Sequence, residues 1–194
     1  MHRHLIRNVV QLLTLWIAED CYGRFFKKKA DPRFESFNES WIKYFFQLTI
    51  TVASKSKDPS TKVGAICVDI PSKRILTTSY NGFPAGVAES TERWERPVKQ
   101  LRVVHAEANC ISSGARFGII LEGSAIFITH PACVECTKLI LSAGIKEVYF
   151  LDIPLEIKGQ RQCVQNALPI AKEMCEECGV KVYAFSQDEL NLSV

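Results

Sequence analysis

The stretch AIFITHPACVECTKLILSA, residues 125–143, carries the clearest structural signal in this chain. Ala125 to Thr129 are apolar or β-branched, as in a buried strand. Behind a proline, Cys133 to Ala143 continue as a helix. A strand that leads directly into a helix is the repeating unit of α/β proteins. The two cysteines, Cys133 and Cys136, therefore stand at the carboxyl edge of a predicted sheet, where the binding sites of α/β proteins form.

The same alternation of strands and helices extends on both sides of this stretch. The pattern predicts, in order, a helix Glu39–Val52, strands Val63–Asp69 and Arg74–Tyr80 forming a hairpin, a helix His105–Arg116, the strand and helix above, a strand Lys146–Leu151, a helix Gln162–Cys178 closed by Gly179, and a strand Val180–Phe185. We therefore expect an α/β fold, a three-layer α-β-α sandwich with a five-stranded, mixed and mostly parallel sheet.

Composition narrows the class of protein. The 194 residues are 47% hydrophobic and 23% charged, which is typical of one globular core. A net charge of +3 suits a small anionic ligand and falls short of the basic stripe of nucleic-acid binders. Eight cysteines in a chain of this length indicate free thiols in a reducing compartment, so we expect a cytoplasmic protein.

The first 37 residues differ from the rest. Apolar residues between Leu5 and Trp16 recur at helical spacing and predict an amphipathic helix, and residues 23–35 read as a basic linker. A signal peptide is disfavoured because polar residues interrupt the apolar run and no small-residue cleavage site follows it. We therefore expect an N-terminal helical extension and linker over residues 1–37 and the main domain over residues 38–194.

The two cysteines are placed to hold a metal ion. Free N–H groups and the dipole at a helix N-terminus lower thiol pKa values, and the two-residue gap lets both sulfurs point at one ion. Zinc is the natural metal for such a pair, and a tetrahedral zinc site needs further ligands. His105 is the best third ligand because it begins a predicted helix with an acid, Glu107, beside it.

Glu107 sets a geometric condition. Positions i and i+2 of a regular helix point about 200° apart and cannot share a centre. His105 must therefore lie at the helix start, outside the regular turn, so that the imidazole reaches the metal and Glu107 reaches a water on the fourth position. In that arrangement Glu107 is not a ligand but moves a proton, and the activated water attacks an amidine carbon so that ammonia leaves.

These residues resemble the zinc deaminase signature, in which histidine, any residue and glutamate are followed by proline, cysteine, two residues and cysteine. One departure is Ala132, which directly precedes the first cysteine, with Pro131 one place earlier. The similarity is closest to the deoxycytidylate deaminase branch over roughly residues 41–151. It rests on the segments WIKYFFQLTITVASKSKDPSTKVGAICVD, SYNGFPAGV, HAEAN and THPACVECTKLILSAGIKEVYF.

The resemblance implies a cytidine-deaminase-like fold, Zn²⁺ on His105, Cys133 and Cys136, and Glu107 as proton shuttle. It implies hydrolysis of dCMP to dUMP and ammonia. It further implies that Asn81 binds the substrate and that the backbone at Ala106 faces the pyrimidine. Members of this branch are often homo-oligomers, frequently hexamers, that dCTP activates and dTTP inhibits.

The residues themselves suggest where a phosphate could bind. The loop after the first predicted helix carries Lys57, Ser60, Thr61 and Lys62, whose cationic and hydroxyl groups suit an anion. We take Ser60 and Lys62 as the predicted substrate contacts of this loop. Residues 89–100, just before His105, are predicted to form a solvated loop or a lid on the substrate side.

Alternatives stay open. The substrate could be cytidine, dCTP or a base in single-stranded nucleic acid in place of dCMP. A structural zinc site would need a fourth protein ligand, for which His130 is the near candidate, and a non-catalytic zinc module would leave Glu107 turned away from the metal. Cys175 and Cys178 form a second CxxC, which we interpret as core packing at a helix end rather than as a second zinc site.

Overall fold

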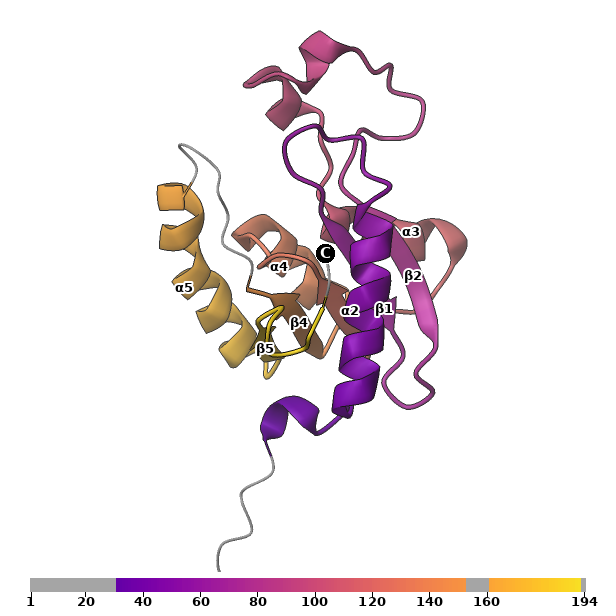
Figure 1. Ribbon diagram of the computed structural model, residues 1–194, viewed down its shortest axis with the longest axis vertical. Helices are drawn as coiled ribbons and strands as arrows, with labels where there is room; N and C mark the ends of the chain where they lie inside the picture. The colour runs from indigo at the N-terminus through magenta and orange to yellow at the C-terminus, as the bar shows by residue number, and fades with distance from the viewer. Residues whose placement is uncertain (1–30, 153–160, 193–194) are drawn as a thin grey trace, which may run out of the picture. The chain divides into compact units, whose positions relative to one another are not determined.

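The computed structural model describes residues 31–152 and 161–192. Five strands form one sheet in the order β2-β1-β3-β4-β5 (Figure 1). Antiparallel pairing joins β1 to β2 and to β3, whereas β3, β4 and β5 run parallel. The strands are β1 Gly64–Val68, β2 Ile75–Tyr80, β3 Ala125–Ile128, β4 Glu147–Leu151 and β5 Lys181–Phe185. The predicted mixed five-stranded sheet is confirmed.

Helices cover both faces of this sheet. The helices are α2 Glu39–Ala53, α3 Ala106–Phe117, α4 Val134–Ser142 and α5 Arg161–Glu177. Helix α2 lies in front of the sheet in Figure 1 and packs on β1, β2 and β3, while α3 packs on the opposite face of β1 and β2 and contacts α4. Helix α4 in turn contacts α5, which packs on β5. The three-layer α-β-α arrangement follows from these contacts.

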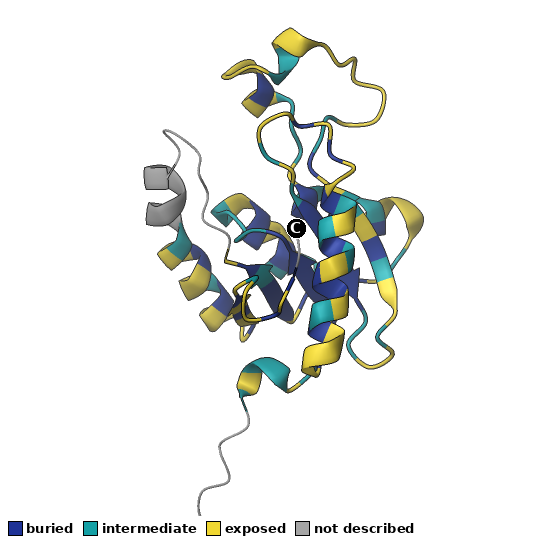
Figure 2. Ribbon diagram, in the orientation of Figure 1, coloured by how far each residue is buried: buried dark blue, intermediate teal, exposed yellow. Residues whose placement is uncertain are grey.

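The period-2 alternation of the central strands separates two cores. Ile126 and Ile128 of β3 are buried with Ala106 and Cys110 of α3, whereas Phe127 points to the other face. There Phe127 packs against the α2 aromatic rings, with ring centroids 5.0 Å from Phe45 and 5.3 Å from Phe46. Figure 2 shows the central strands buried and the outer faces of the helices exposed, whereas the edge strands β2 and β5 keep exposed residues. The central strands are buried on both sides because helices cover both faces.

Helix boundaries decide how the site is presented. Helix α3 begins at Ala106, one residue later than the predicted span, and His105 is its N-cap with φ −67° and ψ 154°. The condition that the histidine precedes the regular turn is therefore met. Helix α4 likewise begins after its N-cap, Cys133, which is extended at φ −73° and ψ 166°.

Residues 89–100 are not simply a solvated loop. They contain two short 3₁₀ helices, η2 Thr91–Trp94 and η3 Val98–Leu101, and Lys99 is buried. The third short helix, η1 Pro32–Phe34, lies in the segment that precedes the main unit, which spans Phe37–Val194. The predicted N-terminal amphipathic helix lies outside the described residues and stays a prediction. Among the helices of the described ranges, none combines the length and the apolar character needed to cross a bilayer.

Candidate active site

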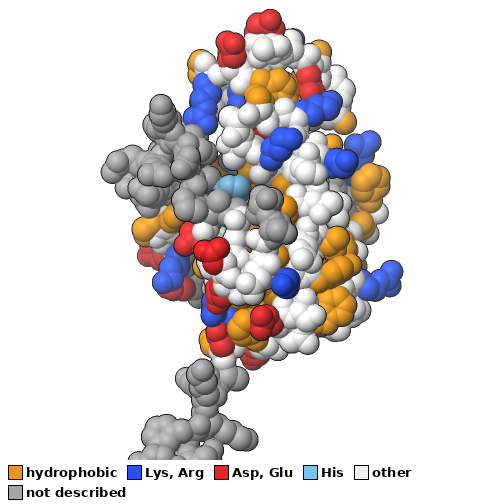
Figure 3. Space-filling view, in the orientation of Figure 1, with side chains coloured by type: hydrophobic (Ala, Val, Ile, Leu, Met, Phe, Trp, Pro, Cys, Tyr) orange, Lys and Arg blue, Asp and Glu red, His pale blue; other side chains and the backbone are white. Residues whose placement is uncertain are grey.

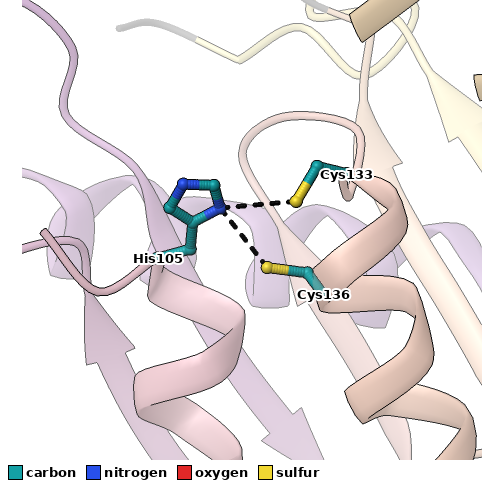
Figure 4. A group of neighbouring side chains, drawn as sticks. All are labelled: His105, Cys133 and Cys136. Atoms are coloured by element: carbon teal, nitrogen blue, oxygen red, sulfur yellow. Dashed lines mark hydrogen bonds between the residues drawn. The ribbon is translucent and has the colours of Figure 1, made fainter. Parts of the chain in front are cut away.

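Two helix N-termini meet where β3 ends. After Ile128, the loop through His130 leads to Cys133 at the start of α4, and His105 stands at the start of α3 (Figure 4). The imidazole lies opposite the two sulfur atoms, so the side chains converge on one point from two helices. The positive ends of both helix dipoles therefore face the same point, which favours thiolates there.

The distances within this cluster fit a zinc ion. The His105 Nδ1 atom lies 3.5 Å from Cys133 Sγ and 3.4 Å from Cys136 Sγ, and all three ligand atoms lie within 4.8 Å of one another. Ordinary zinc–nitrogen and zinc–sulfur bonds at a tetrahedral angle place nitrogen and sulfur about 3.6 Å apart. Across the described part of the chain, no fourth His, Cys, Asp or Glu joins this group. Three protein ligands with one open position are typical of a catalytic zinc site, so the geometry favours that class over a structural one.

The ionisation of the sulfur pair suits metal binding. A hydrogen bond from the Cys136 thiol, with a further one from His105, lowers the pKa of Cys133 to about 4. The pKa of Cys136 is raised, because its thiol donates that hydrogen bond and is buried beside a charged neighbour. Hydrogen bonding to Cys133 also raises the pKa of His105. One sulfur is therefore a thiolate at neutral pH, which is the form that binds zinc.

Glu107 lies in the first turn of α3 and is buried, with 4% of its surface exposed. It lines the same cavity as His105 and Cys133, and its carboxyl interacts electrostatically with both side chains. Burial raises the pKa of Glu107 to about 6. A carboxyl with a pKa near the operating pH can both accept and release a proton, which is what a general acid–base group needs.

A cavity of about 370 Å³ opens in front of this cluster. This volume lies in the usual range for a small-molecule site. Its walls come from the loops after α2 and β2, the η3 segment, the start of α3 and the loop after β3. The lining residues are Asp58, Thr61, Val63, Asn81, Arg96, Lys99, Gln100, Val103, His105, Ala106, Glu107, His130, Pro131 and Cys133. Asn81 and Ala106 therefore line the same cavity as His105 and Cys133, as a substrate role requires.

Two other predicted substrate contacts lie elsewhere. Ser60 and Lys62 do not line the cavity. The Ser60 hydroxyl donates to Asp58 Oδ1 at 2.9 Å and accepts a hydrogen bond from Lys99 Nζ at 2.6 Å. The Lys62 ammonium is exposed and lies 3.5 Å from the Ser54 carbonyl oxygen. A role for either in substrate binding stays a prediction.

The Asn81 amide is held by the protein. Its Oδ1 accepts from the Val63 N–H at 2.8 Å, and its Nδ2 donates to Asp58 Oδ2 and to the Thr61 carbonyl, both at 3.0 Å. Both amide hydrogens are therefore used within the fold. These hydrogen bonds show that Asn81 organises the loop that follows α2. One lone pair of Oδ1 is left to accept a hydrogen bond from a ligand.

Sequence reasoning missed the buried pair of Asp58 and Lys99. Lys99 Nζ lies 2.6 Å from Asp58 Oδ2, and the side chains are 9% and 1% exposed. The same carboxylate accepts hydrogen bonds from the backbone N–H groups of Ser60 and Thr61. The sequence signal was weak, because a lysine in a polar loop is ordinarily solvated. This pair fastens η3 to the loop after α2.

The other cysteines are separate from this centre. Cys175 is buried in the core with α3 and α4 residues, and Cys178 is exposed. Cys67 and Cys110 are fully buried in the core. The interpretation of Cys175 as a packing residue is consistent with its place in the core, and the candidate metal group of the described residues does not include it.

Comparison with known proteins decides the family. A model of the cytidine and deoxycytidylate deaminase zinc-binding region matches residues 39–152, which contain all three cluster residues and Glu107. The chain belongs to this family. It is a zinc-dependent deaminase, and the predicted family is confirmed.

Individual relatives resemble this chain to different degrees in sequence and in structure. An uncharacterised deaminase of Aliivibrio fischeri is 37% identical over 142 residues, covering 73% of this chain and 91% of that protein. The deoxycytidylate deaminase of Mus musculus is 36% identical over 130 residues, covering 64% and 68%. Among solved structures, the dCMP deaminase of cyanophage S-TIM5 matches with a TM-score of 0.55 and 27% identity, over 74% of this chain and 97% of that one.

Proposed function

We propose that this deaminase converts dCMP to dUMP and ammonia. The observation that carries the proposal is the cavity in which a buried glutamate stands beside a His-Cys-Cys metal group. Several relatives are deoxycytidylate deaminases, and the cyanophage enzyme, at a TM-score of 0.53 in that form, has been solved in complex with dCMP and dUMP. These relatives support a monophosphate substrate.

We assign the zinc ligands as His105, Cys133 and Cys136. When bound, zinc supplies a Lewis acid that lowers the pKa of a water at the open position to about 7. Glu107 then accepts a proton from the attacking water on its carboxylate and passes it to N3 of the cytosine ring. The water oxygen bonds to C4 as the first proton reaches N3. Glu107 then takes the second proton from the new C4 hydroxyl and gives it to N4, so the C4–N4 bond breaks, ammonia departs and C4 becomes a carbonyl.

The remaining substrate contacts follow from position. Ala106 is buried at the start of α3 and lines the cavity, so its small side chain leaves room for the pyrimidine against the backbone. Asn81 would accept a hydrogen bond from a sugar hydroxyl through the free lone pair of Oδ1. Both roles are part of the proposal.

The test is release of ammonia from four substrates by the purified, zinc-loaded protein: dCMP, deoxycytidine, dCTP and a single-stranded oligonucleotide. We expect dCMP to give the highest kcat/KM. On the face drawn in Figure 3, basic side chains are interspersed with acidic and apolar ones, which suits a nucleotide better than a polynucleotide. Faster turnover of the nucleoside, the triphosphate or the oligonucleotide would overturn the substrate assignment and leave the chemistry intact.

Further predictions belong to the same proposal. We expect a homo-oligomer, with a hexamer as the form to test by light scattering. We also expect activation by dCTP, inhibition by dTTP and a cytoplasmic location. The effect of dCTP and of dTTP on the initial rate is the direct test of regulation.

A further inference from the structure

The charges around the cavity are unevenly balanced. Lys99 is paired with the Asp58 carboxylate at 2.6 Å, and both side chains are almost completely buried. This pair therefore contributes no net charge to the cavity, although both residues line it. The Glu107 carboxylate lies at the metal end. Arg96 is the remaining lysine or arginine among the residues that line the cavity.

Arg96 has no protein partner among the residues that the structure describes. Its side chain is exposed, and it makes no hydrogen bond or ion pair with a described group. Its neighbours along the chain differ in this respect, since Arg93 donates to the Ala88 carbonyl at 2.6 Å and Arg102 to the Val98 carbonyl at 3.3 Å. The guanidinium of Arg96 is thus free to bind an anion from the cavity.

The backbone holds Arg96 beside the cavity. On one side, the Lys99 N–H donates to the Glu95 carbonyl at 2.8 Å, and the buried Lys99 side chain fastens the turn. On the other side, the Trp94 ring stacks on Phe83 with centroids 4.2 Å apart and an interplanar angle of 11°. Contacts on both sides reduce the ordering cost of placing the guanidinium at the cavity.

We propose that Arg96 binds the 5′-phosphate of the nucleotide and so sets the preference for a monophosphate over a nucleoside. This inference rests on the proposed function. A phosphate monoester carries a charge of about −1.5 to −2 at neutral pH, and a guanidinium can donate two parallel hydrogen bonds to it. The buried Lys99 positions the turn and keeps its own charge on Asp58, so Arg96 rather than Lys99 meets the phosphate.

The test compares two variants that each remove one positive charge. Arg96→Gln removes the unpaired cation that lines the cavity. Lys62→Gln removes an exposed cation of the loop after α2, which the sequence predicted as the phosphate-binding loop. For Arg96→Gln we expect kcat/KM for dCMP to fall about 10- to 100-fold, mainly through KM, because a charge-assisted hydrogen bond is lost. Its kcat/KM for deoxycytidine should stay within about twofold of the wild-type value. The control is Lys55→Gln, which changes an exposed lysine that does not line the cavity and should leave both values unchanged.

Binding of the product gives a readout that does not depend on turnover. By calorimetry, Arg96→Gln should weaken binding of dUMP by a similar factor and leave binding of deoxyuridine unchanged. Arg96→Lys, which keeps the charge but not the planar fork, should recover part of the affinity for dUMP. Equal zinc content and melting temperature would establish that the variants are folded.

The outcomes separate the two proposals. A wild-type protein that releases ammonia from deoxycytidine but not from dCMP contradicts the proposed function. A wild-type protein that deaminates dCMP, with the same preference for dCMP over deoxycytidine and the same affinity for dUMP in Arg96→Gln, contradicts the role of Arg96 alone. If Lys62→Gln loses the preference for dCMP over deoxycytidine and Arg96→Gln keeps it, the role of Arg96 is contradicted and the phosphate is assigned to the loop after α2.

Discussion

At the scale of single residues, the site depends on two residues that stand directly before the first regular turn of a helix. His105 is the N-cap of α3 and Cys133 the N-cap of α4, so each can reach the centre from an extended backbone. Glu107 is the second residue of α3, is buried, and lines the same cavity as His105 and Cys133. The proposed roles, His105 as metal ligand and Glu107 as proton carrier, both depend on the residue at which α3 begins.

Removing the Glu107 carboxylate should stop catalysis and spare the metal. In Glu107→Gln, we expect kcat to fall by about 10²- to 10⁴-fold because no group remains to move the proton. Ammonia release measures the rate, and metal analysis should find zinc unchanged. The matched control is Glu135→Gln, an exposed glutamate between the two cysteines that pairs with Lys138. Comparable rates in both variants would refute the proton-carrier role.

The buried pair of Asp58 and Lys99 is the second feature of this scale. Asp58→Asn leaves the Lys99 charge buried without its partner, and we expect a loss of about 3 kcal/mol in the free energy of unfolding. Urea unfolding measures the loss. Glu89→Gln breaks the exposed pair of Lys57 and Glu89 and should cost less than about 1 kcal/mol. If both variants lost less than about 1 kcal/mol, water would have to solvate the Lys99 ammonium once its partner is removed.

The stability difference between wild type and Asp58→Asn should depend on pH. Burial alone would raise the pKa of Asp58, but hydrogen bonds from Lys99, Ser60 and backbone N–H groups together lower it. A lowered folded-state pKa stabilises the fold above the unfolded-state pKa of about 3.9, and this contribution is lost as pH falls through the folded-state value. Urea unfolding curves measured from about pH 7 to about pH 2 give the free energy of unfolding of both proteins. The difference between wild type and Asp58→Asn should be constant above about pH 5 and should shrink below about pH 4.

At the scale of elements, the close packing of α2 on β1 requires a residue without a side chain. A Cβ atom on Gly64 would lie 2.3 Å from the Thr49 carbonyl oxygen and 2.8 Å from the Ala53 nitrogen, both in the α2 backbone. The helix and strand therefore approach at a distance that only glycine permits. The strand places its next residues, including Ala65, in the core beneath the site.

Substitution of Gly64 tests this contact. We expect Gly64→Ala to lower the free energy of unfolding by about 1–3 kcal/mol because helix and strand must separate. Chemical denaturation provides the measurement. Gly82→Ala is the control, since a Cβ there meets the Tyr80 ring at 3.9 Å, which is ordinary contact. Equal stability of both variants would show that α2 shifts without cost.

At the scale of the whole molecule, the metal group joins two helices that follow different strands. Helix α3 packs on β1 and β2, and α4 follows β3, so a metal held by His105, Cys133 and Cys136 links both parts of one sheet face. We expect zinc to bind this arrangement more tightly than the unfolded chain, so that metal binding and folding are coupled.

Removal of zinc should therefore lower the melting temperature. At free zinc about 1,000 times Kd, metal binding stabilises the fold by about 4 kcal/mol, and chelation should remove this stabilisation reversibly. Calorimetry with and without a chelator measures the shift. Cys136→Ser should melt near the chelated wild type, whereas Cys178→Ser, which alters an exposed thiol, should respond to zinc as the wild type does. A melting temperature that is independent of chelator would contradict the link.

Much of the fold and of the metal group could be predicted from the sequence because both depend on local patterns. The two-residue spacing of the cysteines, the histidine before Glu107 and the alternation of strands and helices are each read within a few residues. These patterns predicted the mixed sheet and placed the proposed zinc ligands at or near helix starts.

Only the tertiary structure decided which loops complete the cavity. Lys99 contacts Asp58 across 41 positions of the chain, and Asn81 contacts it across 23. Neither contact has a local signal, because a charged side chain in a loop is solvated unless packing buries it with a partner. The cavity-facing position of Arg96 depends on the same packing. The residues proposed for metal binding and catalysis can thus be predicted from short-range sequence patterns. The walls of the cavity depend on contacts between residues far apart in the sequence, which only packing in the folded chain decides.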